Sequence, residues 1–513
     1  MTNSGCLRLA LLVLLTCGMA AGQTTLSSLV ANNTSACPAA PPLPAHCRAS
    51  FPGQTDSRSG IATPLFDPPA GNVSDEDPHA YLTNGANTKI FATFMLGFCT
   101  QGKGPYCHNN VRTGYNSNDG ATIAAQAEDL VRRHIDGAIL TWEGYGASED
   151  DAALKFQHYV NTHHCSGAQK CDPMYLLMLD GPSTSYSVRA TGIPGTTGSG
   201  CGGKSGADFE NCAIAHLRND MCAMNGTHWG NDAYLKQNGR PVLLVFPAED
   251  VIRATGPAPS WTDIWIHIQE WNRDLPHNCA RPPFNANNGV PLIVFESTPG
   301  FAHAASGGSY YWVQPPATDP SKQFITNIAD APSTTTETLQ HFLQVARKQP
   351  ASMTWGAAFK GFNSALSAWG AGRVLDQACG QTWIASLTAG NVYYAPATLP
   401  FLQIITWNDY NEGTEIETGI DNCYTIETSL SGSTLTWRLK SSSQFASVST
   451  VSHFEVYDST DGENLRSLGS VPAATSGTWN LAGLPPGQHR LFVRMVGKNS
   501  ILNRISAPIT YSR

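Results

Sequence analysis

Charged side chains are scarce in this chain of 513 residues. Asp, Glu, Lys and Arg together make up only 14% of the sequence, and the net charge is −8. This weakly charged, acidic balance argues against nucleic acid or an anionic membrane as a partner. Low charge combined with 12 Trp and 16 Tyr is typical of a secreted protein that handles a neutral polymer.

The sequence also lacks the cysteine spacing of a zinc site. No CxxC pair occurs, and the histidines do not cluster near the cysteines, so we expect no bound metal. No organic cofactor is indicated either. The apolar run near the N-terminus, residues 9–15, is too short to span a bilayer as a stable anchor.

Residues 1–22 have the features of a cleaved signal peptide. Arg8 precedes the apolar run, and small residues (GMAAG, 18–22) follow it. Lipid attachment at Cys17 is an alternative that fits less well, because the preceding threonine is a poor match. Cleavage would remove Cys6 and Cys17 and leave 12 of the 14 cysteines. In an oxidising extracellular compartment, most of these 12 should form disulfides.

Close spacing predicts four disulfides that staple loops. Residues 23–87, rich in Pro, Ser, Thr, Asn and Gly, predict an extended lead-in held by one of them. The predicted pairs are Cys37 with Cys47, Cys99 with Cys107, Cys165 with Cys171, and Cys201 with Cys212; the partners of Cys222, Cys279, Cys379 and Cys423 stay open.

Short apolar runs alternate with segments of helical periodicity between residues 88 and 424. Eight strand candidates interleaved with helices predict an α/β fold, a (β/α)8 TIM barrel. An open doubly wound sheet is the alternative, and it is disfavoured because no Gly-rich phosphate fingerprint follows the first strand. The strand candidates are 90–96, 137–141, 174–179, 241–246, 291–295, 310–313, 353–359 and 402–407. The helix candidates are 121–134 behind Asp119, 149–163, 208–224, 260–275, 336–348 and part of 372–387.

Several strand candidates end in acidic or aromatic residues. In a barrel such residues converge on the face formed by the carboxyl ends of the strands, where active sites lie. A single strand-end acid more often caps the next helix, so the argument depends on the convergence. The residues are Trp142 and Glu143, Asp180, Glu249 and Asp250, Glu296, and Asp409.

The densest cluster of this kind is the stretch FLQIITWNDYNEGTEIE, residues 401–417. An apolar, β-branched run switches abruptly to aromatic, amide and carboxylate side chains, as at the end of a buried strand. Two carboxylates beside flat aromatic rings are what cleavage of a glycosidic bond requires. The alternative is an acidic loop that is solvated or binds a cation.

After residue 424 the pattern changes to short alternating runs separated by turns. This pattern predicts an all-β sandwich over residues 425–513, similar to immunoglobulin or fibronectin type III modules. We expect it to act as a spacer in preference to a glycan-binding module.

The segment QIITWNDYNE, residues 403–412, resembles the W-N-D-Y-x-E motif of the family-71 glycoside hydrolases, the fungal-type α-1,3-glucanases or mutanases. Residues 90–97, 134–138 and 234–246 resemble other segments of that family in the same order. The resemblance covers roughly residues 88–420 and implies that Asp409 and Glu412 are the catalytic pair.

The residues that follow, GTEIE at 413–417, depart from family 71. They look more like the motif of the related family-99 endo-α-mannanases and mannosidases, whose two acids also lie three residues apart. Family 71 implies inversion of the anomeric centre, whereas family 99 implies retention through the substrate's own 2-hydroxyl. The sugar and the stereochemistry therefore stay open.

The sequence thus predicts a secreted, endo-acting α-glycoside hydrolase that cuts α-1,3-glucan, with Glu412 as general acid and Asp409 as base. The alternatives are a family-99-like endo-α-mannanase, a non-catalytic carbohydrate-binding protein, and an adhesin that displays the C-terminal module. Trp142, Trp312, Trp407 and Tyr410 are expected to stack on sugars, and Asp180, Glu249 and Asn408 to hydrogen-bond hydroxyls, with Glu143 and Glu415 completing the substrate site. Core packing is the alternative for Trp142 and Trp312.

Overall fold

The computed structural model describes residues 72–99, 116–180, 206–246, 261–273, 285–313, 338–363 and 374–513, with isolated positions at 24, 26, 29, 55–56, 63–64, 109–110, 201, 204 and 279. The predicted signal peptide, most of the lead-in and Glu249 lie outside the described residues. So do the side chains of the predicted pairs Cys37–Cys47 and Cys99–Cys107.

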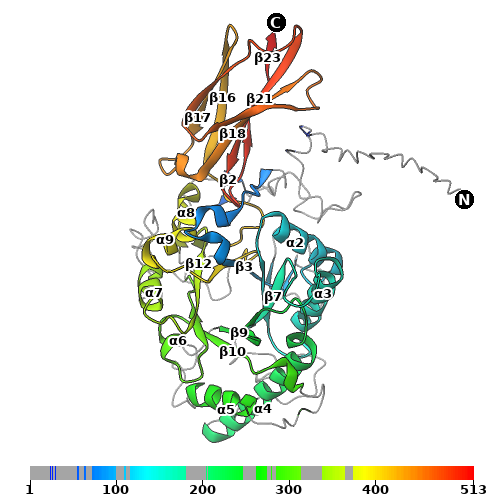
Figure 1. Cartoon of the computed structure of the whole chain (residues 1–513), viewed down its shortest axis with the longest axis vertical. Helices are drawn as coiled ribbons and strands as arrows, with labels where there is room; N and C mark the ends of the chain where they lie inside the picture. The colour runs from blue at the N-terminus through cyan, green and yellow to red at the C-terminus, as the bar shows by residue number, and fades with distance from the viewer. Residues whose placement is uncertain are drawn as a thin grey trace, which may run out of the picture.

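Eight parallel strands close into a barrel surrounded by helices, which confirms the predicted fold class (Figure 1). Each strand pairs with the next along the chain, β10 pairs with both β9 and β11, and β15 pairs back to β3. The strands are β3 (Lys89–Phe94), β6 (Gly137–Trp142), β7 (Met174–Asp180), β9 (Arg240–Phe246), β10 (Leu292–Glu296), β11 (Gly308–Tyr310), β12 (Met353–Ala358) and β15 (Phe401–Ile404). Short strand pairs flank them: β1 (Thr55–Asp56) with β2 (Thr63–Pro64), β4 (Phe98–Cys99) with β5 (Asn109–Asn110), β13 (Phe362–Asn363) with β14 (Val374–Leu375), and β8 (Lys236–Gln237) with β9.

The helices lie close to the predicted segments. The first begins after Asp119, whose side chain accepts a hydrogen bond from Thr122 N at 3.0 Å, as its N-cap position predicts. The helices are α2 (Gly120–Arg132), α3 (Ser148–His163), α4 (Gly206–Met224), α5 (Trp261–Arg273), α6 (Pro299–Ala302), α7 (Leu339–Ala346), α8 (Gln381–Leu387) and α9 (Ala389–Tyr393). Among the described residues, no helix combines the length and apolar character needed to cross a bilayer.

Two predicted strand positions need correction. The sixth strand, predicted at 310–313, is Gly308–Tyr310, and Trp312 follows it. The strand begins with Gly308, a residue that sequence patterns do not associate with strands. Glycine is needed there because a Cβ would lie 2.1 Å from the carbonyl oxygen of Met353 on the neighbouring strand. The eighth strand ends at Ile404, three residues before the predicted end at Trp407.

The pairing register separates an outer from an inner face of the barrel. Phe295 and Tyr311 contact helix residues, namely Trp265 of α5 and Phe342 of α7, so they face outward. Because successive side chains of a strand point to opposite faces, the neighbours of these outward-facing residues point toward the barrel axis. On that inner face Trp355 stacks on Phe401 with ring centroids 4.4 Å apart. The side on which a strand-end residue lies can therefore be read from this alternation.

The C-terminal residues form two antiparallel sheets that pack face to face, as the predicted all-β sandwich requires (Figure 1). Their shared core contains Trp437 from one sheet and Phe454 from the other, with ring centroids 5.6 Å apart. One sheet contains β16 (Tyr424–Ser431), β17 (Thr434–Ser441) and β20 (Ser476–Asn480). The other contains β18 (Val451–Ser459), β19 (Arg466–Pro472), β21 (Gln488–Gly497), β22 (Arg504–Ile505) and β23 (Ile509–Ser512).

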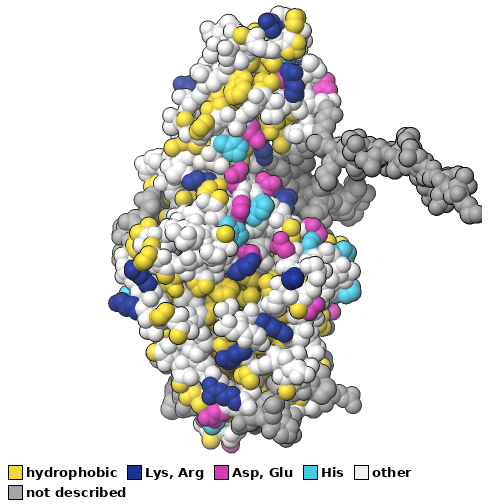
Figure 2. Space-filling view, in the orientation of Figure 1, with side chains coloured by type: hydrophobic (Ala, Val, Ile, Leu, Met, Phe, Trp, Pro, Cys, Tyr) yellow, Lys and Arg dark blue, Asp and Glu magenta, His cyan; other side chains and the backbone are white. Residues whose placement is uncertain are grey.

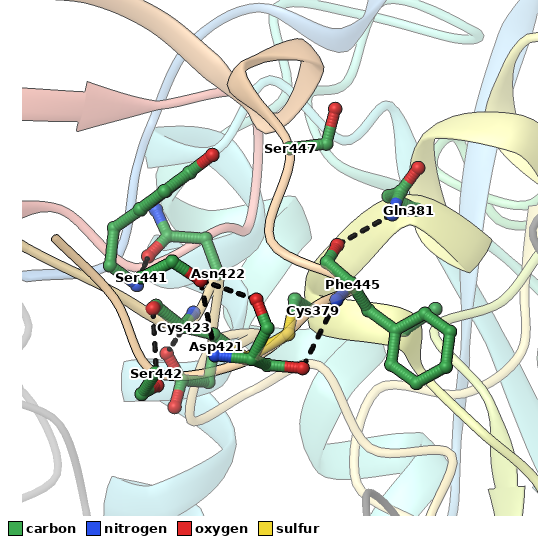
Figure 3. The surroundings of a disulfide bond; sticks show 12 residues. Cys379, Gln381, Asp421, Asn422, Cys423, Ser441, Ser442, Phe445 and Ser447 are labelled. Atoms are coloured by element: carbon green, nitrogen blue, oxygen red, sulfur yellow. Dashed lines mark hydrogen bonds between the residues drawn. A yellow bond between two sulfur atoms is a disulfide. The ribbon is translucent and has the colours of Figure 1, made fainter. Parts of the chain in front are cut away.

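A disulfide between Cys379 and Cys423 joins the barrel to the sandwich (Figure 3). Cys379 precedes α8, and Cys423 directly precedes β16. Cys222 pairs with Cys279, and the predicted pairs Cys165–Cys171 and Cys201–Cys212 are confirmed. On the visible face, acidic and histidine side chains gather where the two parts meet (Figure 2).

Candidate active site

The acidic stretch after β15 forms a closed loop, residues 407–413, which we call the acid loop. Thr406 and Thr414 clamp its base: Thr406 N donates to the carbonyl of Thr414 at 3.1 Å, and the two hydroxyl oxygens lie 2.9 Å apart. Ile416 N then donates to the carbonyl of Thr406 at 3.1 Å. The loop is therefore a fixed excursion at the carboxyl end of the last barrel strand, the location expected for an active site.

Asp409 and Glu412 lie within one turn of this loop. A single carboxylate oxygen of Asp409, Oδ1, accepts the backbone N–H groups of Asn411 and Glu412, each at 3.0 Å. The Asp409 N–H donates to Thr406 Oγ1 at 2.9 Å. Asp409 is only 3% exposed, whereas Glu412 is partly exposed.

The two carboxylates therefore occupy different environments. Burial raises the pKa of Asp409 from 3.8 to about 7, against the two backbone N–H groups, which lower it; the negative charge of Glu415 adds to the rise. A carboxylate that titrates near neutral pH beside a second, more accessible acid is suited to general acid–base chemistry.

Glu415, which was predicted to line the substrate site, forms a buried ion pair with Lys360. Its Oε1 lies 2.8 Å from Lys360 Nζ, and both side chains are 4% exposed. Lys360 follows β12, the strand next to β15, and no sequence motif singles it out. The Glu415 carboxylate lies near enough to Asp409 for its negative charge to raise the pKa of that residue.

Asn408 and Tyr410 anchor the acid loop to the residues that follow β3 and β15. Asn408 Oδ1 accepts the N–H of Met95 at 2.8 Å, and its amide nitrogen donates to the carbonyl of Met95 at 3.2 Å. Tyr410 packs against Phe98 and Met95, and its hydroxyl donates to Glu417 at 2.9 Å. The predicted roles of Asn408 and Tyr410 in substrate binding stay predictions, and the structure shows that the protein itself bonds their polar groups.

The predicted stacking roles of Trp142 and Trp407 also need correction. Trp142 lies on the outer face of the barrel, where its Nε1 donates to Asp150 of α3 at 3.0 Å. Trp407 donates to Gln126 of α2, and the Arg133 guanidinium lies 4.8 Å from its ring centroid. Both rings are fully buried against the helix layer, so neither presents a face to a sugar.

A second group of predicted residues lies on the inner face at the carboxyl ends of β7, β10 and β11. Asp180 and Glu296 both raise the pKa of Tyr310, which burial already holds well above its usual value, so the three side chains share this part of the barrel. Trp312 lies against Phe246 with ring centroids 4.7 Å apart. The predicted roles of Asp180 and Trp312 in substrate binding stay predictions. The sequence did not single out Phe246 or Tyr310.

The remaining predicted residues add little to the geometry. Glu143 follows β6 and is partly buried, and Glu249 lies outside the described residues.

Among the described residues, the one set of three side chains near enough to share a metal ion is Cys201, Cys212 and His216. Because Cys201 and Cys212 form a disulfide, their sulfurs are not thiolate ligands.

Comparisons with known proteins give only distant likenesses. No family model matches the sequence, and no curated protein matches it either. Among solved structures, the chain is similar to the GH99 endo-α-mannosidase of Bacteroides thetaiotaomicron, with 11% identity and a TM-score of 0.39 over 64% of this chain and 87% of that one. A glycoside hydrolase-like protein has 11% identity and a TM-score of 0.40, over 64% of this chain and 86% of that one. The β-glucuronidase of Parabacteroides merdae has 7% identity and a TM-score of 0.32, over 83% of this chain and 49% of that one. At these values the likenesses carry no argument about activity.

Proposed function

We propose that this chain is a secreted, endo-acting α-glycoside hydrolase whose substrate is α-1,3-glucan. The observation that supports the proposal is the Asp409–Glu412 turn at the carboxyl end of β15, in which one carboxylate is buried and the other is partly exposed. Glycosidic cleavage needs two acids with different protonation states on opposite sides of the scissile bond. The contrast in burial makes the two carboxyl groups chemically inequivalent, and Asp409 is ionised, as a base must be, above its pKa of about 7.

In the proposed mechanism Glu412 is the general acid. Its partial exposure lets it meet the glycosidic oxygen of a bound polymer and donate a proton to the leaving group. Asp409 is the base: once ionised, it removes a proton from the attacking water. The hydrogen bonds from Asn411 N and Glu412 N to Asp409 Oδ1 leave Oδ2 as the oxygen available for that proton.

A family-99-like endo-α-mannanase is the second candidate, supported by the sequence GTEIE at residues 413–417. In that case Asp409 would deprotonate the 2-hydroxyl of the substrate instead of a water, and the anomeric configuration would be retained. Proton NMR of the first product from an α-linked substrate separates the two: an initial β-anomer means inversion, and an α-anomer means retention.

The experiment that tests the function uses a panel of α-glucans and α-mannans with product chromatography. Glu412→Gln removes the transferable proton, so hydrolysis of the natural polymer should fall by about two to four orders of magnitude. Glu412→Gln should recover activity on an activated aryl glycoside, whose leaving group needs little protonation. Asp409→Asn should not recover, because the nucleophile still lacks its base.

Glu427→Gln is the matched control, since Glu427 lies on the sandwich surface and pairs with Arg438. It should hydrolyse the polymer as the wild type does. Near-wild-type turnover by both Asp409→Asn and Glu412→Gln would show that the acid loop is not the catalytic centre. A wild type that binds but never cleaves a member of the panel would favour the carbohydrate-binding alternative.

A further inference from the structure

Glu417 is a buried carboxylate that the proposed mechanism does not use. Both of its oxygens accept hydrogen bonds: Oε2 from the Tyr410 hydroxyl at 2.9 Å, and Oε1 from Gln126 Nε2 at 2.7 Å. Glu417 lies after the Thr406–Thr414 clamp, whereas Tyr410 lies inside the acid loop between Asp409 and Glu412. The carboxylate therefore ties the interior of the loop to a position outside it.

Helix α2 and the residue after it hold Glu417 in place from the opposite side. Gln126 uses both ends of its amide, since its Nε2 donates to Glu417 and its Oε1 accepts from Trp407 Nε1. The buried Arg133 guanidinium donates to the carbonyls of Ile416, at 2.8 Å, and of Glu417. A salt bridge to Asp129 Oδ2 at 3.0 Å fixes the guanidinium in turn.

We propose that Glu417 is a positioning residue for the catalytic pair and acts through Tyr410; the inference rests on the proposed function. Asp409 and Glu412 are three residues apart with Tyr410 between them, so the position of Tyr410 sets the separation and direction of the two carboxyl groups. A hydrogen bond to a charged acceptor is stronger and more directional than a neutral one. The contacts from α2 make the acceptor itself immobile.

Tyr410→Phe tests the proposal with a small change, because it removes one hydroxyl and keeps the ring packed on Phe98. Displacement of catalytic groups by a fraction of an ångström lowers turnover strongly, so kcat should fall roughly ten- to hundredfold. KM should stay within about twofold, because the ring of Tyr410 packs on Phe98 and its hydroxyl donates to Glu417, both within the protein. The loss should persist on an activated aryl glycoside, since the displaced base affects that substrate too.

Tyr457→Phe is a matched control. The Tyr457 hydroxyl donates to Glu455 Oε2 at 2.9 Å within the sandwich, so the variant loses a tyrosine–carboxylate bond of the same length far from the acid loop. Its kcat should equal that of the wild type. If the Tyr410–Glu417 bond served stability alone, the two variants would lose folding stability and both would keep full kcat, which would overturn the inference.

A second variant, Glu417→Gln, completes a double-mutant cycle. If Glu417 acts through Tyr410, the double variant Tyr410→Phe/Glu417→Gln should lose little more kcat than the more impaired single variant. Additive losses in kcat would overturn the proposed route through Tyr410. A wild type that hydrolyses none of the glycan panel overturns the proposed function, whereas active wild type with an equally active Tyr410→Phe overturns this inference alone.

Discussion

Asp409 and Glu415 show two ways in which this chain buries a carboxylate. Glu415 has a cation, Lys360, at 2.8 Å, which offsets the cost of removing its charge from water. Among the described residues, the Asp409 carboxylate has as partners the backbone N–H groups of its own loop. A buried carboxylate without a cation costs more free energy when it is ionised. This cost raises the pKa of Asp409 to about 7, so that the group is neutral at lower pH.

The raised pKa of Asp409 predicts a stability effect with a definite sign. Between pH 3.8 and about 7 the folded state keeps a proton that the unfolded chain has released. The raised pKa of Asp409 therefore stabilises the folded state fully below pH 3.8, and this stabilisation is lost as the pH rises through about 7. Asp409→Asn mimics the protonated form, so its stability relative to wild type should increase from pH 4 to pH 8, measured by thermal unfolding.

Asp461→Asn serves as a control, because its pH dependence lies below pH 3.8, outside the range in which that of Asp409→Asn is measured. The Asn464 side chain and the N–H groups of Glu463 and Asn464 hold the pKa of Asp461 below its usual range. Stability that depends on its charge is present above the unfolded pKa and lost in acid, so this variant should be less stable than wild type at pH 8. A change in Asp409→Asn that is independent of pH would contradict the assigned protonation.

Glu415 provides a test of the pH dependence of activity. If Asp409 is the base, kcat/KM rises as the pH passes through its pKa of about 7. Glu415→Gln removes a negative charge that raises this pKa and keeps an oxygen for Lys360. The acid limb of the kcat/KM profile should therefore move to lower pH, with Glu427→Gln as a control that leaves it in place. An acid limb that stays or moves upward would contradict the electrostatic link.

At this scale the sequence predicted which residues gather at the strand ends but not which way they point. Trp142 is one position from the inner face, and this single step places its ring among the helices. Tyr410 and Asn408 were sugar-facing candidates because of their chemistry, and only the fold shows that Glu417 and Met95 occupy their polar groups. Lys360 could not be predicted as a site residue, because its partner Glu415 lies 55 residues away in the sequence.

At the scale of whole elements, sequence patterning predicted most of the barrel. Apolar runs bounded by turn residues gave seven strand positions close to the observed ones, since burial on both faces produces continuous apolar stretches. The sixth strand was misplaced because Gly308 and Ser309 carry no strand preference, and the reason for the glycine is a close backbone approach from Met353. Such tertiary constraints are not visible in a local pattern.

The disulfides offer a quantitative prediction at this scale. Loss of a disulfide frees chain entropy in the unfolded state in proportion to the logarithm of the loop that it closes. Cys379–Cys423 spans 44 residues and Cys165–Cys171 only 6. Replacing each pair by serine should cost about 4 and about 2 kcal/mol, respectively, in the free energy of unfolding. Denaturant titration measures both, and a larger loss for the short loop would contradict the entropic account.

At the scale of the molecule, the sandwich is built into the barrel and does more than space it. The segment after β21 inserts Ile501, which is fully buried, into the barrel's own core cluster. Asn499 donates from its amide to the carbonyl of Arg133 at 3.0 Å and accepts the Trp383 Nε1–H on its own carbonyl at 2.9 Å. This junction weighs against the expected spacer role, under which truncation near residue 425 would leave the barrel intact.

The last prediction asks whether the two parts unfold as one. Leu491 is fully buried in the sandwich core and belongs to no barrel cluster. Leu491→Ala should cost about 2–5 kcal/mol, and if the junction couples the parts, hydrogen exchange in β3 and β15 should accelerate together with that in β18 and β21. Ile501→Ala, in the barrel core, should accelerate exchange in both parts in the same way.

If the sandwich is only a spacer, Leu491→Ala should accelerate exchange in the sandwich strands alone, while hydrolysis and exchange in the barrel keep their wild-type rates. Because Arg133 bridges Asn499 and Glu417, joint acceleration would also mean that the acid loop depends on the sandwich for its support.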